Sequence, residues 1–108
     1  MIAERLRVAD THWTRLRGLL GTSDFPAGNG LWIRPCRQVH MFGMRYAIDV
    51  VFLDDACRVV GLTPDLAPWK ISPLCRTATS VLELPVGAIR TSQLAIGSTL
   101  SMAAHASH

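Results

Sequence analysis

Long apolar runs are missing from this sequence of 108 residues. No stretch approaches the roughly 20 apolar residues that a membrane-spanning helix needs, so we expect no membrane insertion. Charged residues near the N-terminus, at Glu4, Arg5 and Arg7, stand where a signal peptide has its apolar segment. The sequence therefore predicts a cytoplasmic protein.

Charge of either sign is also sparse, at 18% of residues, and the net charge is only +3. Arginines supply nearly all of the positive charge and are scattered along the chain, while aromatic residues make up 6%. Nucleic-acid binding requires a stripe of basic residues interleaved with stacking aromatics. We therefore expect no specific nucleic-acid binding.

Cysteine occurs three times, at Cys36, Cys57 and Cys75, with wide and irregular spacing. No CxxC pair or zinc-type Cys/His spacing is present, so we predict no metal site and no cofactor. The alternative is a soft ligand set for Cu(I), but methionine commonly fills gaps in cores. That set would consist of Cys36, His40, Met41 and Met44. In a cytoplasmic chain, three reduced thiols are expected.

Hydrophobic residues are plentiful, at 49%, and the length suits one domain with a single core. We expect one domain over residues 1–108, ordered from about 5 to 103, with a flexible tail at 104–108. One helix is predicted from about residue 10 to 20, because apolar residues recur there at helical spacing. Alternating or continuous apolar patterns predict short strands at 5–9, 31–34, 38–42, 48–53, 57–63, 79–84 and 99–103.

Proline and glycine separate these strands. Pro64, Pro68 and Pro73 predict an irregular loop, because proline lacks the donor that a central strand needs. Asp54-Asp55-Ala56 predicts a tight hairpin turn, and residues 86–95 suit a turn or a short helix. The fold class is therefore mainly β: a jelly-roll-like sandwich or a partly open barrel with one short N-terminal helix.

Several motifs occur together in order and spacing over about residues 5–102. They include Arg17-Gly18-Leu19-Leu20-Gly21, Gly30-Leu31-Trp32-Ile33, the run Ile48 to Asp54, and the run Val81 to Gly87. With them the chain resembles domain-of-unknown-function family 192, small bacterial and archaeal proteins with no assigned activity. The resemblance implies a mainly β, jelly-roll-like fold. Because the activity of the family is not established, the resemblance assigns no catalytic residue to this chain. Many relatives carry a glycine in the hairpin turn where this chain has Ala56-Cys57.

Two carboxylates, Asp49 and Glu83, stand among apolar strand residues. A buried acid is costly unless it is paired or hydrogen-bonded. One interpretation is that each accepts hydrogen bonds from backbone amides or an arginine and so holds loops in place. The alternative is a small hydrolase or transferase in which Asp49, Glu83 and His40 perform acid–base chemistry.

Basic and aromatic residues gather around residues 34–46, and a further exposed aromatic is expected in the proline-bearing loop. They predict a shallow pocket for a small anionic or carbohydrate ligand. The predicted ligand-binding residues are Arg34, His40, Arg45, Tyr46 and Trp69, with Trp32 beside them. The leading hypothesis is a non-enzymatic binding or accessory module. The alternative is a protein partner in an envelope, secretion or pilus-assembly complex.

Overall fold

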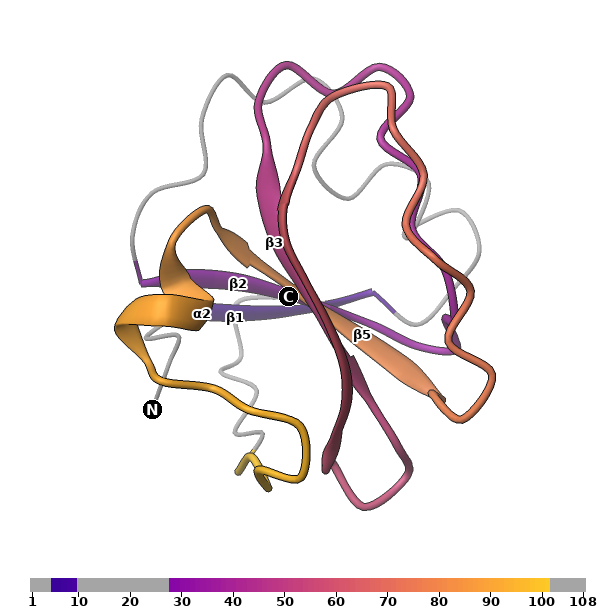
Figure 1. The fold of residues 1–108 in the computed structure, drawn as a ribbon, viewed down its shortest axis with the longest axis vertical. Coiled ribbons are helices and arrows are strands. Elements are labelled where there is room, and N and C mark those ends of the chain that lie inside the picture. Colours follow the sequence, from indigo (N-terminus) through magenta and orange to yellow (C-terminus); the bar gives the residue numbers. More distant parts are fainter. Residues whose placement is uncertain (1–4, 10–27, 102–108) are drawn as a thin grey trace.

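A five-stranded sheet organises the protein (Figure 1). The structure, a computed structural model, describes residues 5–9, as backbone, and residues 28–101. The strands, in sequence order, are β1 (Arg5–Ala9), β2 (Asn29–Ile33), β3 (Ile48–Leu53), β4 (Val59–Leu66) and β5 (Ser80–Pro85). In the sheet they lie in the order β1-β2-β5-β3-β4. β1 runs parallel to β2, and the other neighbouring pairs are antiparallel.

The predicted mainly β fold is confirmed, and within the described residues the sheet stays open, with β1 and β4 at its edges. The strands predicted at 5–9 and 48–53 have the observed bounds. The short helix α2 (Ala88–Thr91) lies inside the predicted turn region 86–95. The predicted helix over residues 10–20 and the tail at 104–108 fall outside the described residues.

Strand β3 is buried on both faces, and each of its residues exposes at most 2% of its surface. Ile48, Val50 and Phe52 join the core cluster on one face of the sheet. Val51 and Leu53 join the cluster on the other face. Burial on both faces explains why the residues that follow Asp49, Val50 to Leu53, are all apolar rather than alternating with polar ones.

Two long segments, residues 34–47 and 67–79, run side by side and cover the first of these faces (Figure 1). We call them the loop pair. The strand predicted at 38–42 is wrong, because the structure has only an isolated bridge between His40 and Ile71 there. Gly43, at a φ of 82°, turns the chain immediately afterwards, so the ladder cannot extend. Val39 and Met41 still point into the core.

The prediction that Pro64 lies in an irregular loop is also wrong, because β4 continues through it to Leu66. β4 is an edge strand with β3 as its one neighbour, and Pro64 lies at the register shift, where it has no partner in β3. The missing N–H of this proline therefore removes no hydrogen bond from the ladder. The strand predicted at 99–103 reduces, in the described part, to one bridge between Arg58 and Thr99. That bridge lies beside the β3–β4 turn.

Candidate functional site

The carboxylate of Asp49 is buried at the start of β3 and binds three backbone amides. Oδ1 accepts the N–H of Asp65 at 2.9 Å. Oδ2 accepts the N–H groups of Gly87 at 3.1 Å and Ile89 at 2.9 Å. One side chain thus joins the end of β4 and the beginning of α2 to β3.

An irregularity in the β3–β4 pairing brings the first of these amides into place. The register shifts between Ile48 and Val50, so that two residues of β4 oppose Asp49 alone. Asp65 takes the left-handed conformation there, with a φ of 53°. This conformation is tolerated by aspartate and directs the Asp65 N–H toward the Asp49 carboxylate.

Glu83 is buried in β5 with 6% of its surface exposed. It lies between Leu31 of β2 and Val50 of β3 in the register of the sheet. The described part of the chain offers its carboxyl no hydrogen bond or ion pair. Burial raises the pKa of Glu83 from 4.5 to about 8. The carboxyl is therefore largely protonated at neutral pH.

Asp49 and Glu83 point to opposite faces of the sheet. Asp49 pairs with Leu84, whereas Glu83 pairs with Val50, and adjacent strand residues face opposite ways. His40 is exposed on the loop pair. The structure therefore does not bring together the three residues that the enzymatic alternative requires.

The exposed surface of the loop pair instead carries three aromatic rings in contact, which we call the aromatic platform: His40, Phe42 and Trp69. The ring centroids of His40 and Phe42 are 5.0 Å apart, and those of Phe42 and Trp69 are 6.1 Å apart. The planes are inclined by only 31° and 29°. Phe42 exposes 46% and Trp69 67% of its surface.

Of the predicted ligand-binding residues, His40 and Trp69 are brought together, through Phe42. Sequence reasoning missed Phe42, although the alternation of buried Val39 and Met41 with exposed His40 and Phe42 indicates it. Arg45 is exposed and Tyr46 is half-buried against the core. Arg34 lies elsewhere, with its guanidinium carbon 4.5 Å from the centre of the Trp32 ring.

The β3–β4 turn forms a separate polar cluster. Asp54 Oδ1 accepts the backbone N–H groups of Ala56 and Arg58, both at 2.9 Å. These hydrogen bonds lower the pKa of Asp54 below its ordinary value, and the bond from the Arg58 N–H has the largest effect. Burial, reinforced by the Asp54 charge, raises the pKa of the neighbouring Cys57 thiol against the opposing effect of Arg34.

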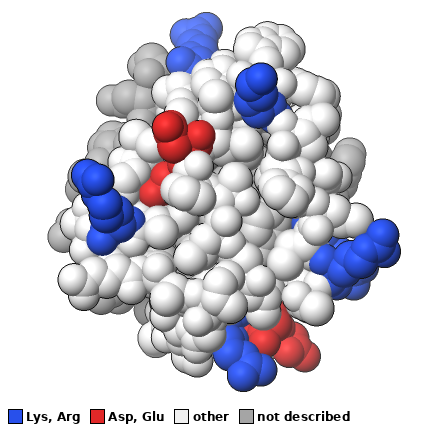
Figure 2. Space-filling model, viewed as in Figure 1, with Lys and Arg blue, Asp and Glu red and all other residues white. Residues whose placement is uncertain are grey.

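Charge does not concentrate on the face seen in Figure 2, where lysine and arginine side chains lie apart around the rim and the middle is uncharged. Within residues 28–101, no three His, Cys, Asp or Glu side chains gather to hold a metal ion. Among the described residues there is also no helix long and apolar enough to cross a membrane.

Sequence comparisons relate this chain to a family of uncharacterised proteins. The profile of family DUF192, described as "Uncharacterized ACR", matches residues 2–102. A UPF0127 protein of Thermococcus sibiricus is 36% identical over 79% of this chain and 57% of its own length. A second, of Thermococcus gammatolerans, is 34% identical over 89% of this chain and 65% of its own. The chain thus spans less than two thirds of the length of these relatives.

Two solved structures share the fold at low sequence identity. A protein of unknown function from Novosphingobium aromaticivorans has a TM-score of 0.77 and 18% identity, over 85% of this chain and 70% of that one. A putative transcription regulator from Sinorhizobium meliloti also has a TM-score of 0.77, with 17% identity, over 85% of this chain and 76% of that one. At such identities the likeness concerns the fold alone.

Proposed function

The chain belongs to domain-of-unknown-function family 192, and we propose that it is a non-enzymatic binding module whose aromatic platform holds a sugar ring. The observation that carries this proposal is the contact between the His40, Phe42 and Trp69 rings, with their planes inclined by about 30° to one another. At these centroid distances the rings overlap in offset stacks, and the faces and edges that stay exposed form one apolar surface. The C–H face of a sugar packs against aromatic surface of this kind.

The platform is held in place before any ligand arrives. The backbone carbonyl of Met41 accepts the backbone N–H of Trp69 at 2.9 Å. The backbone N–H of Met41 donates to the backbone carbonyl of Lys70 at 2.8 Å. Trp69 has a φ of 69°, which is uncommon for a bulky residue and persists only where the surroundings impose it. A surface fixed in this way loses little conformational freedom on binding.

Neighbouring charges support an acidic sugar over a neutral one. Lys70 follows Trp69 directly and is exposed, and Arg45 lies three residues after Phe42 and is exposed too. In the described residues neither side chain has an ion pair. A sugar carboxylate would find a cation near the platform, and its affinity would fall as salt rises.

The test is calorimetric titration with chitotriose, maltotriose and glucuronic acid. Binding of at least one sugar is expected, and Trp69→Ala should weaken it about tenfold, the scale of one lost aromatic contact. Ile71→Ala is the matched control, because Ile71 is 54% exposed on the same loop pair but has no ring. Failure of all three sugars to bind, or equal affinity in the wild type and Trp69→Ala, would contradict the proposal.

A protein partner, such as a component of an envelope or secretion complex, is the second candidate. Ile71 and Leu74, exposed by 54% and 49%, extend the apolar surface beyond the rings. Contiguous exposed apolar surface is typical of protein interaction sites. The same two variants distinguish a sugar ligand from a protein partner. Ile71→Ala and Trp69→Ala should both lower the affinity for a protein partner, whereas only Trp69→Ala should lower the affinity for a sugar.

We also propose that the protein works in a reducing compartment, as a cytoplasmic location requires. The support is that no disulfide joins the three described cysteines, Cys36, Cys57 and Cys75. Thiol titration of protein purified without reductant and then denatured should find three reactive groups. One group would indicate a disulfide and would contradict this location.

A further inference from the structure

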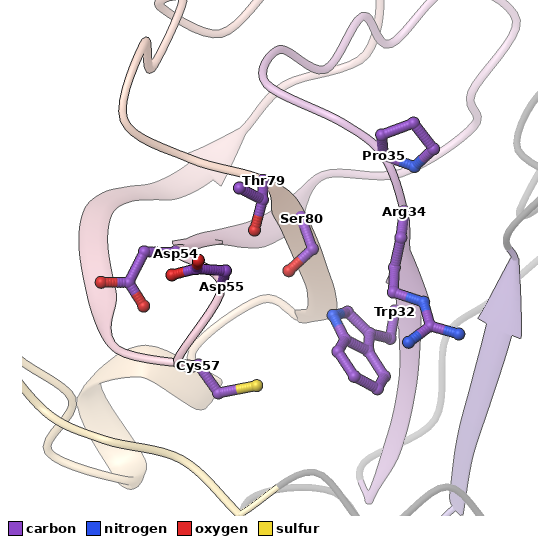
Figure 3. A pocket seen from close by; sticks show the side chains of 8 residues that line it. All are labelled: Trp32, Arg34, Pro35, Asp54, Asp55, Cys57, Thr79 and Ser80. Carbon is purple, nitrogen blue, oxygen red and sulfur yellow. The ribbon is translucent and has the colours of Figure 1, made fainter.

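A pocket of about 420 Å³ opens where three parts of the fold meet: the end of β2, the start of β5 and the β3–β4 turn (Figure 3). Trp32 and Pro35 line one side, and Asp55 and Ser80 lie across from them. A second hollow of about 340 Å³ is lined by Arg37 and shares Pro35 and Thr79 with the first. The two hollows therefore adjoin each other, and we call them together the groove; none of their lining residues belongs to the aromatic platform.

The groove contains a hydrogen-bond donor with no acceptor. Trp32 Nε1 is buried and finds no partner among the described residues. Figure 3 shows the nitrogen edge of the indole turned toward Ser80 at the start of β5. Buried polar groups without a partner are rare in folded proteins, so each one that occurs calls for an explanation. An oxygen atom of a bound ligand would complete this hydrogen bond.

Charged side chains line both hollows: Asp54, Asp55 and Arg34 in the first, and Arg37 in the second. Asp55 is exposed and, in the described part of the chain, its carboxylate has no hydrogen bond or ion pair. Asp54 beside it is occupied by the turn amides and Arg58. Arg37 uses its Nε to donate to the Ala78 carbonyl at 3.1 Å, and none of the described acidic residues pairs with its charge.

From this arrangement we propose that the groove binds a zwitterionic ligand of the short-peptide class. The free amine of the peptide pairs with Asp55, a carbonyl oxygen accepts the Trp32 Nε1–H, and the terminal carboxylate pairs with Arg37. A carboxylate in one hollow, a guanidinium in the adjoining one and a donor that lacks an acceptor match a peptide with both ends free. A neutral sugar would leave both charges unused.

The test uses protein labelled with ¹⁵N, in which the indole N–H resonance of Trp32 is assigned from Trp32→Phe. Triglycine is expected to shift that resonance in a saturable way. N-acetyl-triglycine and triglycine amide should each bind about threefold more weakly, the scale of one exposed ion pair. Asp55→Asn should remove the preference for the free amine, and Arg37→Gln should remove the preference for the free carboxylate.

Asp65→Asn and Arg76→Gln are the controls, because both residues are exposed and lie outside the groove. They should leave both preferences unchanged. A Trp32 resonance that triglycine does not move would overturn the proposal, as would equal affinity for the free and blocked peptides. A shift produced by chitotriose and not by triglycine would assign the groove to sugars instead. The aromatic platform variants test a different surface, so the two proposals fail independently.

Discussion

Asp49 Oδ2 accepts the backbone N–H of Ile89 at 2.9 Å across a sequence separation of 40 residues. Ile89 is the second residue of α2, which spans only Ala88–Thr91 and is too short to be stable alone. Its N-cap residue, Gly87, has no side chain that could bind the free amides. The Asp49 carboxylate from β3 takes over this role, so β3 holds α2 in place.

Replacement of Asp49 by alanine should therefore destabilise the protein strongly. The change leaves the amides of Asp65, Gly87 and Ile89 without their acceptor, at a cost of about 2–4 kcal/mol in the free energy of unfolding. Urea denaturation at neutral pH measures it. Asp55→Ala, at an exposed carboxylate, should change stability by less than about 0.5 kcal/mol. Equal stability of the two variants would contradict the assigned role.

From the raised pKa of Glu83 we predict that the free energy of unfolding falls as pH rises. The folded pKa of about 8 exceeds the ordinary value of 4.5, so the folded state holds its proton more tightly than the unfolded state. The stabilisation is complete below pH 4.5 and is lost as pH rises to 8. Within this window the contribution of this group has a slope of at most about 1.4 kcal/mol per pH unit.

Urea denaturation between pH 5 and 9 checks this prediction, with Glu83→Gln as the comparison. Glutamine is similar in shape and does not titrate, so the variant should lack this part of the decline and should gain on the wild type as pH rises. Parallel pH profiles for the two proteins would show that the Glu83 carboxyl does not bind its proton more tightly on folding.

Cys57→Gly should stabilise the protein. Cys57 has a φ of 59° in the β3–β4 turn, a conformation that costs an ordinary residue roughly 1–2 kcal/mol and glycine almost nothing. Glycine's greater freedom in the unfolded chain offsets part of that gain, so about 0.5–1 kcal/mol is expected. Thermal unfolding measures it. Cys57→Ala, which keeps a Cβ, should give no such gain, and a lower melting temperature for Cys57→Gly would refute this explanation.

The strands were predictable wherever the apolar pattern alone determines the structure. The continuous run at Ile48–Leu53 indicates a strand covered on both faces, and β3 is that strand. Pro64 misled the prediction because a proline's cost depends on whether its missing donor faces a neighbouring strand. That depends on the position of β4 at the edge, which the local sequence does not reveal.

The candidate sites, like the strands, were predictable from the sequence only in part. That Asp49 and Glu83 are acids among apolar strand residues follows from the residue pattern, because the cost of burying charge makes such positions conspicuous. That they face opposite sides of the sheet follows only from the fold, because it depends on the pairing of β3 with β5. The contacts of Phe42 with Trp69 and of Arg34 with Trp32 likewise follow from the fold, because they depend on how the loop pair and the strands pack.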